Sequence, residues 1–179
     1  MITVTEEDTG NWIEEIGKPS FDAIAEMVAA LQCDYDRLEE LIQSGAHERR
    51  IEHGDLEPSD EDKEILEELD ELREAAGWTR EVEHGDGCEN EDEARQRIDE
   101  DPLSLRIFGE RTDGEWVASD YELLLTTGGP AVRIIGDLDN GEATSARLQV
   151  QDWFKPWSEY IAADTEVLMA YVGCFYFGG

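Results

Sequence analysis

The stretch LLLTTGGPAVRIIGDLDNGEATSARLQV, residues 123–150, decides the fold class of this chain. Gly128-Gly129-Pro130 separates two apolar, β-branched segments and favours a reversal of the chain between two strands. Asp139-Asn140-Gly141-Glu142 carries the Asn-Gly pair typical of a tight hairpin turn. The stretch therefore predicts successive antiparallel strands joined by short turns.

The same pattern of short strand-like segments separated by turns extends to both sides of this stretch. Including its flanks, the sequence predicts strands at 103–108, 116–126, 131–136 and 145–153, with a turn at 112–115. The apolar segment 165–177 is either a helix packed on the sheet or a last strand. Aromatic side chains crowd the segment before it, where core packing is favoured over a contact with a partner; they are Trp153, Phe154, Trp157 and Tyr160.

The N-terminal part has the period of helices instead. Residues 1–18 are a polar lead-in, in which Trp12, Ile13 and Ile16 are candidates for docking on the core. Apolar residues from Phe21 to Ile42 then follow a helical stripe, which predicts one helix opening at Pro19-Ser20. Ser59 is the predicted N-cap of a second helix that ends near Gly77. Two amphipathic helices joined by a turn predict an antiparallel hairpin over about 20–77. A short helix is predicted at about 90–100, before Asp101-Pro102.

These elements predict an α+β fold with two parts. Residues 1–101 form an acidic helical region, and residues 102–179 form an antiparallel β-meander that serves as a platform. The long apolar stripe of the first helix leaves a homodimer open.

Charge is the strongest compositional signal. The chain has 46 acidic and 14 basic residues, a net charge of −32, and residues 1–101 hold 34 of the acids against 9 bases. Such a surface repels nucleic acid and anionic membranes, so we expect no direct binding to either. Basic proteins are the natural partners, and nucleic-acid-binding proteins are strongly basic.

Acid is densest on the second predicted helix. Asp60 to Glu74 has a net charge of −7 over 15 residues, which is about 3 Å of helix per charge, against about 3.4 Å per phosphate along one DNA strand. This density predicts a partner-binding surface that imitates a nucleic-acid backbone. Its carboxylates are Asp34, Asp36, Glu39, Glu40, Asp60, Glu61, Asp62, Glu64, Glu67, Glu68, Asp70, Glu71 and Glu74.

Two plainer interpretations compete with mimicry. Charge runs on helices are usually solvated faces, and salt-adapted proteins are acidic and poor in Lys, as this chain is with 3 Lys against 11 Arg. Salt adaptation, however, spreads acid over the whole surface, and the asymmetry at Asp101 argues against it.

Catalytic, metal and cofactor chemistry find little support. The repeated EHGD sequences, 52–55 and 83–86, flank the second helix at opposite ends and offer too few ligands for one ion. Thr126–Pro130 lacks the Lys of a phosphate-binding loop. No nucleophile–base arrangement stands out, so we expect no enzyme activity, no metal and no cofactor. The polar N-terminus and the three scattered cysteines favour a reduced cytoplasm.

Several blocks of the sequence resemble a known group of proteins. They are TTGGPAVRIIGDLDNGE, QDWFKPWSEY, the ending CFYFGG, EMVAALQCDYDRLEEL and ARQRIDEDPLSLRI. They are similar to acidic proteins of unknown function encoded by phages, plasmids and other mobile elements. The resemblance implies no catalytic residues. It implies a context in which acidic DNA mimics block restriction or CRISPR systems.

The leading hypothesis is therefore a cytoplasmic DNA-mimic inhibitor, of the anti-restriction or anti-CRISPR class, that occupies the basic surface of a host nucleic-acid-binding protein. The alternatives are an acidic interaction or assembly module without mimicry, and a salt-adapted cytosolic protein.

Overall fold

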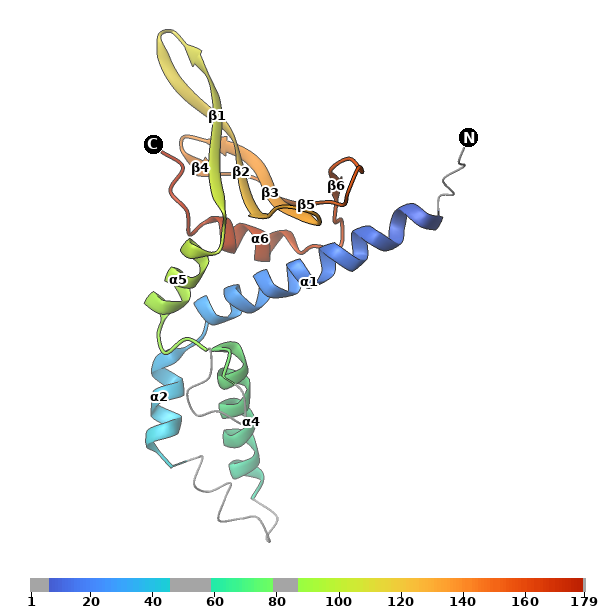
Figure 1. The fold of residues 1–179 in the computed structure, drawn as a ribbon. Coiled ribbons are helices and arrows are strands. Elements are labelled where there is room, and N and C mark those ends of the chain that lie inside the picture. The colour runs from blue at the N-terminus through green and yellow to red at the C-terminus, as the bar shows by residue number, and fades with distance from the viewer. Residues whose placement is uncertain (1–6, 46–58, 79–86, 179) are drawn as a thin grey trace. The chain divides into compact units, whose positions relative to one another are not determined.

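The structure is a computed structural model that describes residues 7–45, 59–78 and 87–178 (Figure 1). The chain divides into two compact units. Unit 1 comprises residues 1–28 and 96–179, and unit 2 comprises residues 29–95. This division differs from the predicted one at Asp101, because the first 28 residues group with the C-terminal sheet.

Unit 1 is built on an antiparallel sheet with strand order β1-β2-β3-β5-β6, and β4 pairs with β3 at the side. Each strand pairs with the next through a short turn, which confirms the predicted α+β class and the C-terminal meander. The strands are β1 (Ser104–Thr112), β2 (Glu115–Thr126), β3 (Ala131–Asp139), β4 (Glu142–Ala143), β5 (Arg147–Gln151) and β6 (Ser158–Glu159).

One face of the sheet carries the core of unit 1. Tyr121, Leu123 and Ile134 alternate with exposed or half-buried residues, as expected for strands with one buried face. Helix α6 (Thr165–Val172) and the first part of α1 (Glu7–Leu31) lie along the sheet in Figure 1. Of the two alternatives for 165–177, the helix is therefore the one observed.

Helix α1 overturns two predictions. It begins at Glu7 and contains Pro19, so residues 7–18 are helical and Pro19 does not open the helix. Packing explains the early start, because Trp12 is buried and the ring of Tyr160 lies against Gly17. The predicted continuous helix from Pro19 to Ile42 is also wrong, because α1 ends at Leu31.

Helix α2 (Tyr35–Gln43) starts afresh after this break. The side chain of Asp34 accepts a hydrogen bond from the backbone N–H of Arg37, at 3.0 Å, and caps the new helix. The Tyr35 hydroxyl donates to the carbonyl oxygen of Ala30, at 2.8 Å, which fixes the turn between α1 and α2.

Unit 2 contains the helical hairpin, formed by α2 and α4 (Asp60–Ala75). The two helices run antiparallel (Figure 1) around a small core of Leu38, Leu41, Leu69 and Ala76. Ser59 caps α4 by accepting from the backbone N–H of Asp62, as predicted. Helix α5 (Glu91–Glu100) matches the predicted short helix. Both EHGD sequences lie outside the described residues.

Candidate acidic interface

Five carboxylates form a straight row along α4. Their spacing of four, three, four and three residues keeps them within an arc of about 80° around the helix and spreads them over about 21 Å. Leu69, which is 1% exposed, lies on the opposite side of the helix. We call this set the α4 row; its members, all exposed, are Asp60, Glu64, Glu67, Glu71 and Glu74.

The local sequence explains why the row faces outward. Ile65, Leu69 and Leu72 turn the opposite side of the helix toward the hairpin core. The Ser59 cap and the acidic residues of the first turn stabilise the N-terminal end, and Arg73 lies in the last turn where a cation is favourable. Burial of the apolar side therefore leaves the row in solvent.

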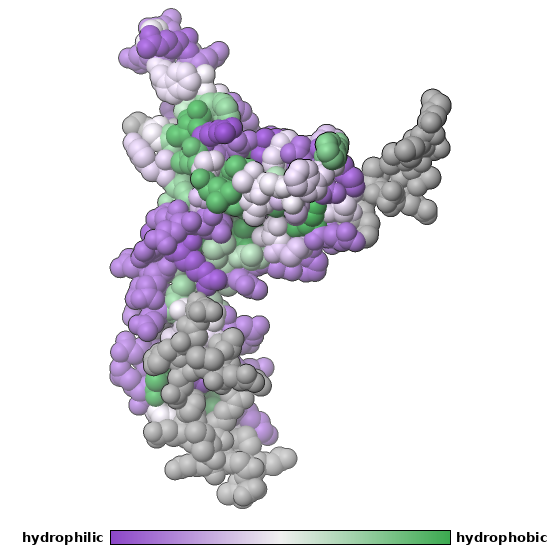
Figure 2. Space-filling model, in the orientation of Figure 1, coloured by the Kyte–Doolittle hydropathy of each residue, from purple (hydrophilic) through white to green (hydrophobic). Residues whose placement is uncertain are grey.

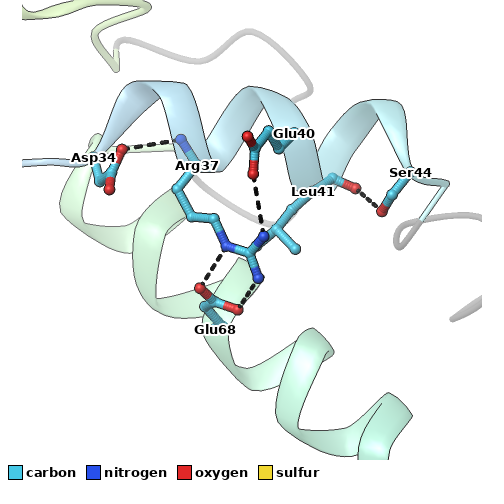
Figure 3. A network of polar contacts seen from close by, with 6 residues as sticks. All are labelled: Asp34, Arg37, Glu40, Leu41, Ser44 and Glu68. Atoms are coloured by element: carbon cyan, nitrogen blue, oxygen red, sulfur yellow. Dashed lines mark hydrogen bonds and ion pairs between the residues drawn. The ribbon is translucent and has the colours of Figure 1, made fainter.

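Of the other carboxylates of α4, Glu61 is exposed, whereas Glu68 and Asp62 are engaged within the protein. Arg37 of α2 donates two hydrogen bonds of 2.8 Å to Glu68 and joins the two helices (Figure 3). These hydrogen bonds, more than the charge attraction itself, lower the pKa of Glu68 below its usual range. Asp62 accepts from the Ser59 hydroxyl. Glu68 and Asp62 are thus structural, although both were predicted to belong to the partner-binding surface.

The row itself is almost unneutralised. Asp60 is 3.5 Å from the ammonium of Lys63, a long and exposed ion pair. Among the described residues, no hydrogen bond or ion pair reaches Glu64, Glu67, Glu71 or Glu74. Surface pairs of the Lys63 kind contribute little, so the described part of the chain leaves the row nearly its full negative charge.

Helix α2 carries a second, smaller set. Asp36, Glu39 and Glu40 are exposed on the side of α2 away from Leu38 and Leu41. Glu40 accepts from Arg37 at 3.3 Å, and Glu39 accepts from the Gln43 amide at 2.8 Å. The structure therefore does not merge the predicted carboxylates into one face: the α2 set and the α4 row point to opposite sides of the hairpin.

A hollow of about 370 Å³ beside α2 is a feature that the sequence analysis missed. Its walls are apolar, from Tyr35, Leu38, Ile42 and Trp78, and its acidic lining comes from Asp36, Glu39 and Glu89. The indole N–H of Trp78 donates to the Cys88 carbonyl and fixes that wall. Apolar walls with carboxylates suit the aliphatic stem and charged head of a Lys or Arg side chain.

The aromatic segment of unit 1 does not follow the favoured core interpretation throughout. Tyr160 is buried, but Trp153 is 63% exposed and Phe154 is fully exposed, so these two lie outside the core. Phe154 also has a φ of 61°, a conformation that bulky residues rarely adopt. Sequence composition gave no signal of this exposure.

The open face of the sheet is occupied by a polar ladder. Arg133 donates to Glu122 at 2.6 Å and to Gln149 at 2.7 and 3.0 Å, and its guanidinium stacks 4.1 Å from the centre of the Trp157 ring. These contacts give the Arg133 guanidinium a structural role within the sheet. Among the described residues, no three His, Cys, Asp or Glu side chains form a group that could hold a metal ion.

Comparison with known proteins adds no relative: no protein family, no curated protein and no solved structure matches this chain. In the described part of the chain, no helix is long and apolar enough to cross a membrane.

Proposed function

We propose that the protein inhibits a basic nucleic-acid-binding protein by occupying its DNA-binding surface with the α4 row. The observation that carries this proposal is the row of five exposed carboxylates, held opposite the buried Leu69 and met, among the described residues, only by the long Lys63–Asp60 pair. Five charges over about 21 Å compare with about six phosphates over the same length of one DNA strand.

The opposed orientation of the α2 set supports mimicry of a duplex. Packed helices lie 8–10 Å apart and have radii of about 5–6 Å with side chains. The outer carboxylates of α2 and α4 are therefore about 20 Å apart, on the scale of duplex width. A cleft that closes around DNA would meet acid on both sides of the hairpin.

Arg37 and Glu68 serve this function by holding the scaffold together. They join α2 to α4 across the hairpin, and Arg37 also contacts Glu40 of the α2 set at 3.3 Å (Figure 3). The hollow beside α2 would receive a basic side chain of the partner, with its stem against Trp78 and its charge beside Asp36 and Glu39.

The class of partner that we propose is a bacterial defence nuclease complex of the restriction or CRISPR type. The resemblance to proteins of mobile elements motivates this class, and the charge of the row supports any partner with a basic DNA-binding cleft.

The test is displacement of DNA. A labelled duplex is bound to each of several purified restriction and CRISPR complexes, and its fluorescence anisotropy is followed as the protein is added. The proposal expects displacement from at least one complex, weakening steeply as salt screens the charges. Binding to a complex without loss of the duplex would favour the assembly-module alternative instead.

A further inference from the structure

Strand β1 forms a free edge of the sheet in unit 1. Its ladder partner is β2, and the order places no strand on its other side. Among the described residues, no backbone hydrogen bond from outside the sheet reaches residues 105–112. Alternate N–H and C=O groups of β1 therefore face away from β2, and no described residue supplies them with a backbone partner.

This edge has only part of the usual protection against pairing, namely its charged side chains Arg106, Glu110 and Arg111. Proteins shield edge strands with charged side chains (Lys above all), Pro, shortness, bulges or a covering element. β1 is nine residues long and contains neither Lys nor Pro. The irregularity at Phe108/Gly109 comes from an extra residue, Ser119, in β2, so β1 itself stays regular.

Exposed apolar side chains accompany the free edge. Phe108 of β1 is 47% exposed and Val117 of β2 is 49% exposed on the same face of the sheet, while Leu105, 38% exposed, lies on the other face. Figure 2 shows hydrophobic side chains gathered over β1 and β2, below the hydrophilic tip of their hairpin. An exposed apolar patch beside an open edge marks an interaction surface.

The charges of β1 identify the occupant. When the strand is paired antiparallel with itself about Phe108, Arg106 lies opposite Glu110, and this happens twice because of the symmetry. Arg106, Phe108 and Glu110 alternate along β1 and so share one sheet face. Pairing about Ile107 instead sets Arg106 opposite Phe108 and matches no charge. One register is therefore self-complementary.

We propose that two copies of the chain associate through antiparallel β1 strands, with a two-fold axis at Phe108. Both charged partners are available: Glu110 is exposed, and Arg106 has only a 3.5 Å contact with Glu122 and is 65% exposed. Paired Phe108 rings and the two Arg106–Glu110 pairs stabilise the register. The net charge of −32 on each chain opposes association, so the dimer strengthens as salt screens this repulsion.

A charge swap tests this arrangement. Glu110→Arg faces each Arg106 with an arginine, and Arg106→Glu faces each Glu110 with a glutamate, so each variant alone weakens dimerisation about tenfold or more. Mixed together, the two variants restore both ion pairs in a heterodimer. Sedimentation equilibrium on wild type, each variant and the equimolar mixture measures this, at an ionic strength where the Debye length is about 8 Å.

Glu142→Arg, an exposed reversal on β4 with the same charge change as Glu110→Arg, is the matched control for that variant and dimerises as wild type does. The proposal is overturned if wild type stays monomeric up to near-millimolar concentration, if either variant alone dimerises as wild type does, or if the mixture does not recover. Recovery in the mixture also shows that both variants fold. Because β1 and the α4 row carry different residues, failure here leaves the DNA-displacement result unaffected.

Discussion

Replacing Tyr171 with phenylalanine removes one hydroxyl from the core of unit 1. Tyr171 is 0% exposed, and its hydroxyl donates to the Asp101 carboxylate, which joins α6 to the residue that follows α5. Hydrogen bonds to charged groups contribute about 1.5–3 kcal/mol, and because Asp101 is exposed its carboxylate regains water in the variant. We expect Tyr171→Phe to lower the free energy of unfolding by about 1–2 kcal/mol.

The same substitution has a defined pH dependence. Burial, reinforced by the bond to Asp101, raises the pKa of Tyr171 well above its ordinary value. A raised folded-state pKa means that the stabilisation is complete below the unfolded pKa, about 10, and is lost as the pH rises above it. The advantage of wild type over Tyr171→Phe should therefore shrink above pH about 10.

Urea denaturation followed by circular dichroism, at neutral pH and in steps into the alkaline range, measures both effects. Tyr35 and Tyr121, whose pKa values burial also raises, are present in both proteins and cancel in the difference. Equal stability at neutral pH, or a difference that stays constant into the alkaline range, would refute the reasoning.

Three further predictions concern individual side chains. Leu69→Ala, at the centre of the unit 2 core, should lower the free energy of unfolding by about 2–5 kcal/mol and lower the protection of backbone amides in α2 and α4 from hydrogen exchange. Glu67→Ala, on the outer side of α4, is its control and should change the free energy of unfolding by no more than about 0.5 kcal/mol. Phe154→Gly should raise the urea midpoint, since it relieves about 1 kcal/mol of left-handed backbone strain and removes a side chain that is fully exposed, so no buried apolar surface is lost. A lower midpoint would contradict this. Arg37→Gln should lower the urea midpoint at neutral pH but not in acid, because the pair with Glu68 is formed above the lowered pKa of Glu68 and is lost as the pH falls through it; an equal deficit at both pH values would contradict it.

Local signals were enough to predict the sheet and the start of α4. The Asn140-Gly141 turn, the turn around Gly128-Gly129-Pro130 and the Ser59 cap each depend on neighbouring residues, and the structure confirms all three. Alternation over a few residues likewise predicted the four longer strands, with ends that differ by a few residues, but not the two-residue strands β4 and β6.

Features that depend on tertiary packing were not predictable in this way. The first turns of α1 are polar in sequence but are held by Trp12, which is buried and lies 4.6 Å from the ammonium of Lys155. The break before α2 was missed because the apolar period continues in phase across Cys33, while the Asp34 cap decides the break.

For the candidate interface, the sequence predicted which carboxylates are dense along the helices but not how they are oriented or paired. The four-three spacing of the α4 row is already visible in the sequence, but its outward orientation follows from the burial of Leu69. The pairing of Glu68 with Arg37 joins residues 31 positions apart, and the hollow walled by Trp78 depends on the hairpin. Long-range contacts of this kind leave no local signal.

The most direct test of the central claim compares DNA displacement by two variants, each with five carboxylates replaced by neutral amides. The first removes the α4 row with Asp60→Asn, Glu64→Gln, Glu67→Gln, Glu71→Gln and Glu74→Gln. The second changes net charge equally at exposed sites of unit 1, with Asp113→Asn, Glu115→Gln, Glu142→Gln, Glu159→Gln and Glu166→Gln. The measurement is the concentration of each protein that displaces half of a labelled duplex from the defence nuclease complex.

If the α4 row imitates a DNA backbone, the first variant loses displacement while the second retains nearly all of it. Equal loss in both variants would mean that net charge alone acts, and full displacement by the first variant would contradict the assignment of the row.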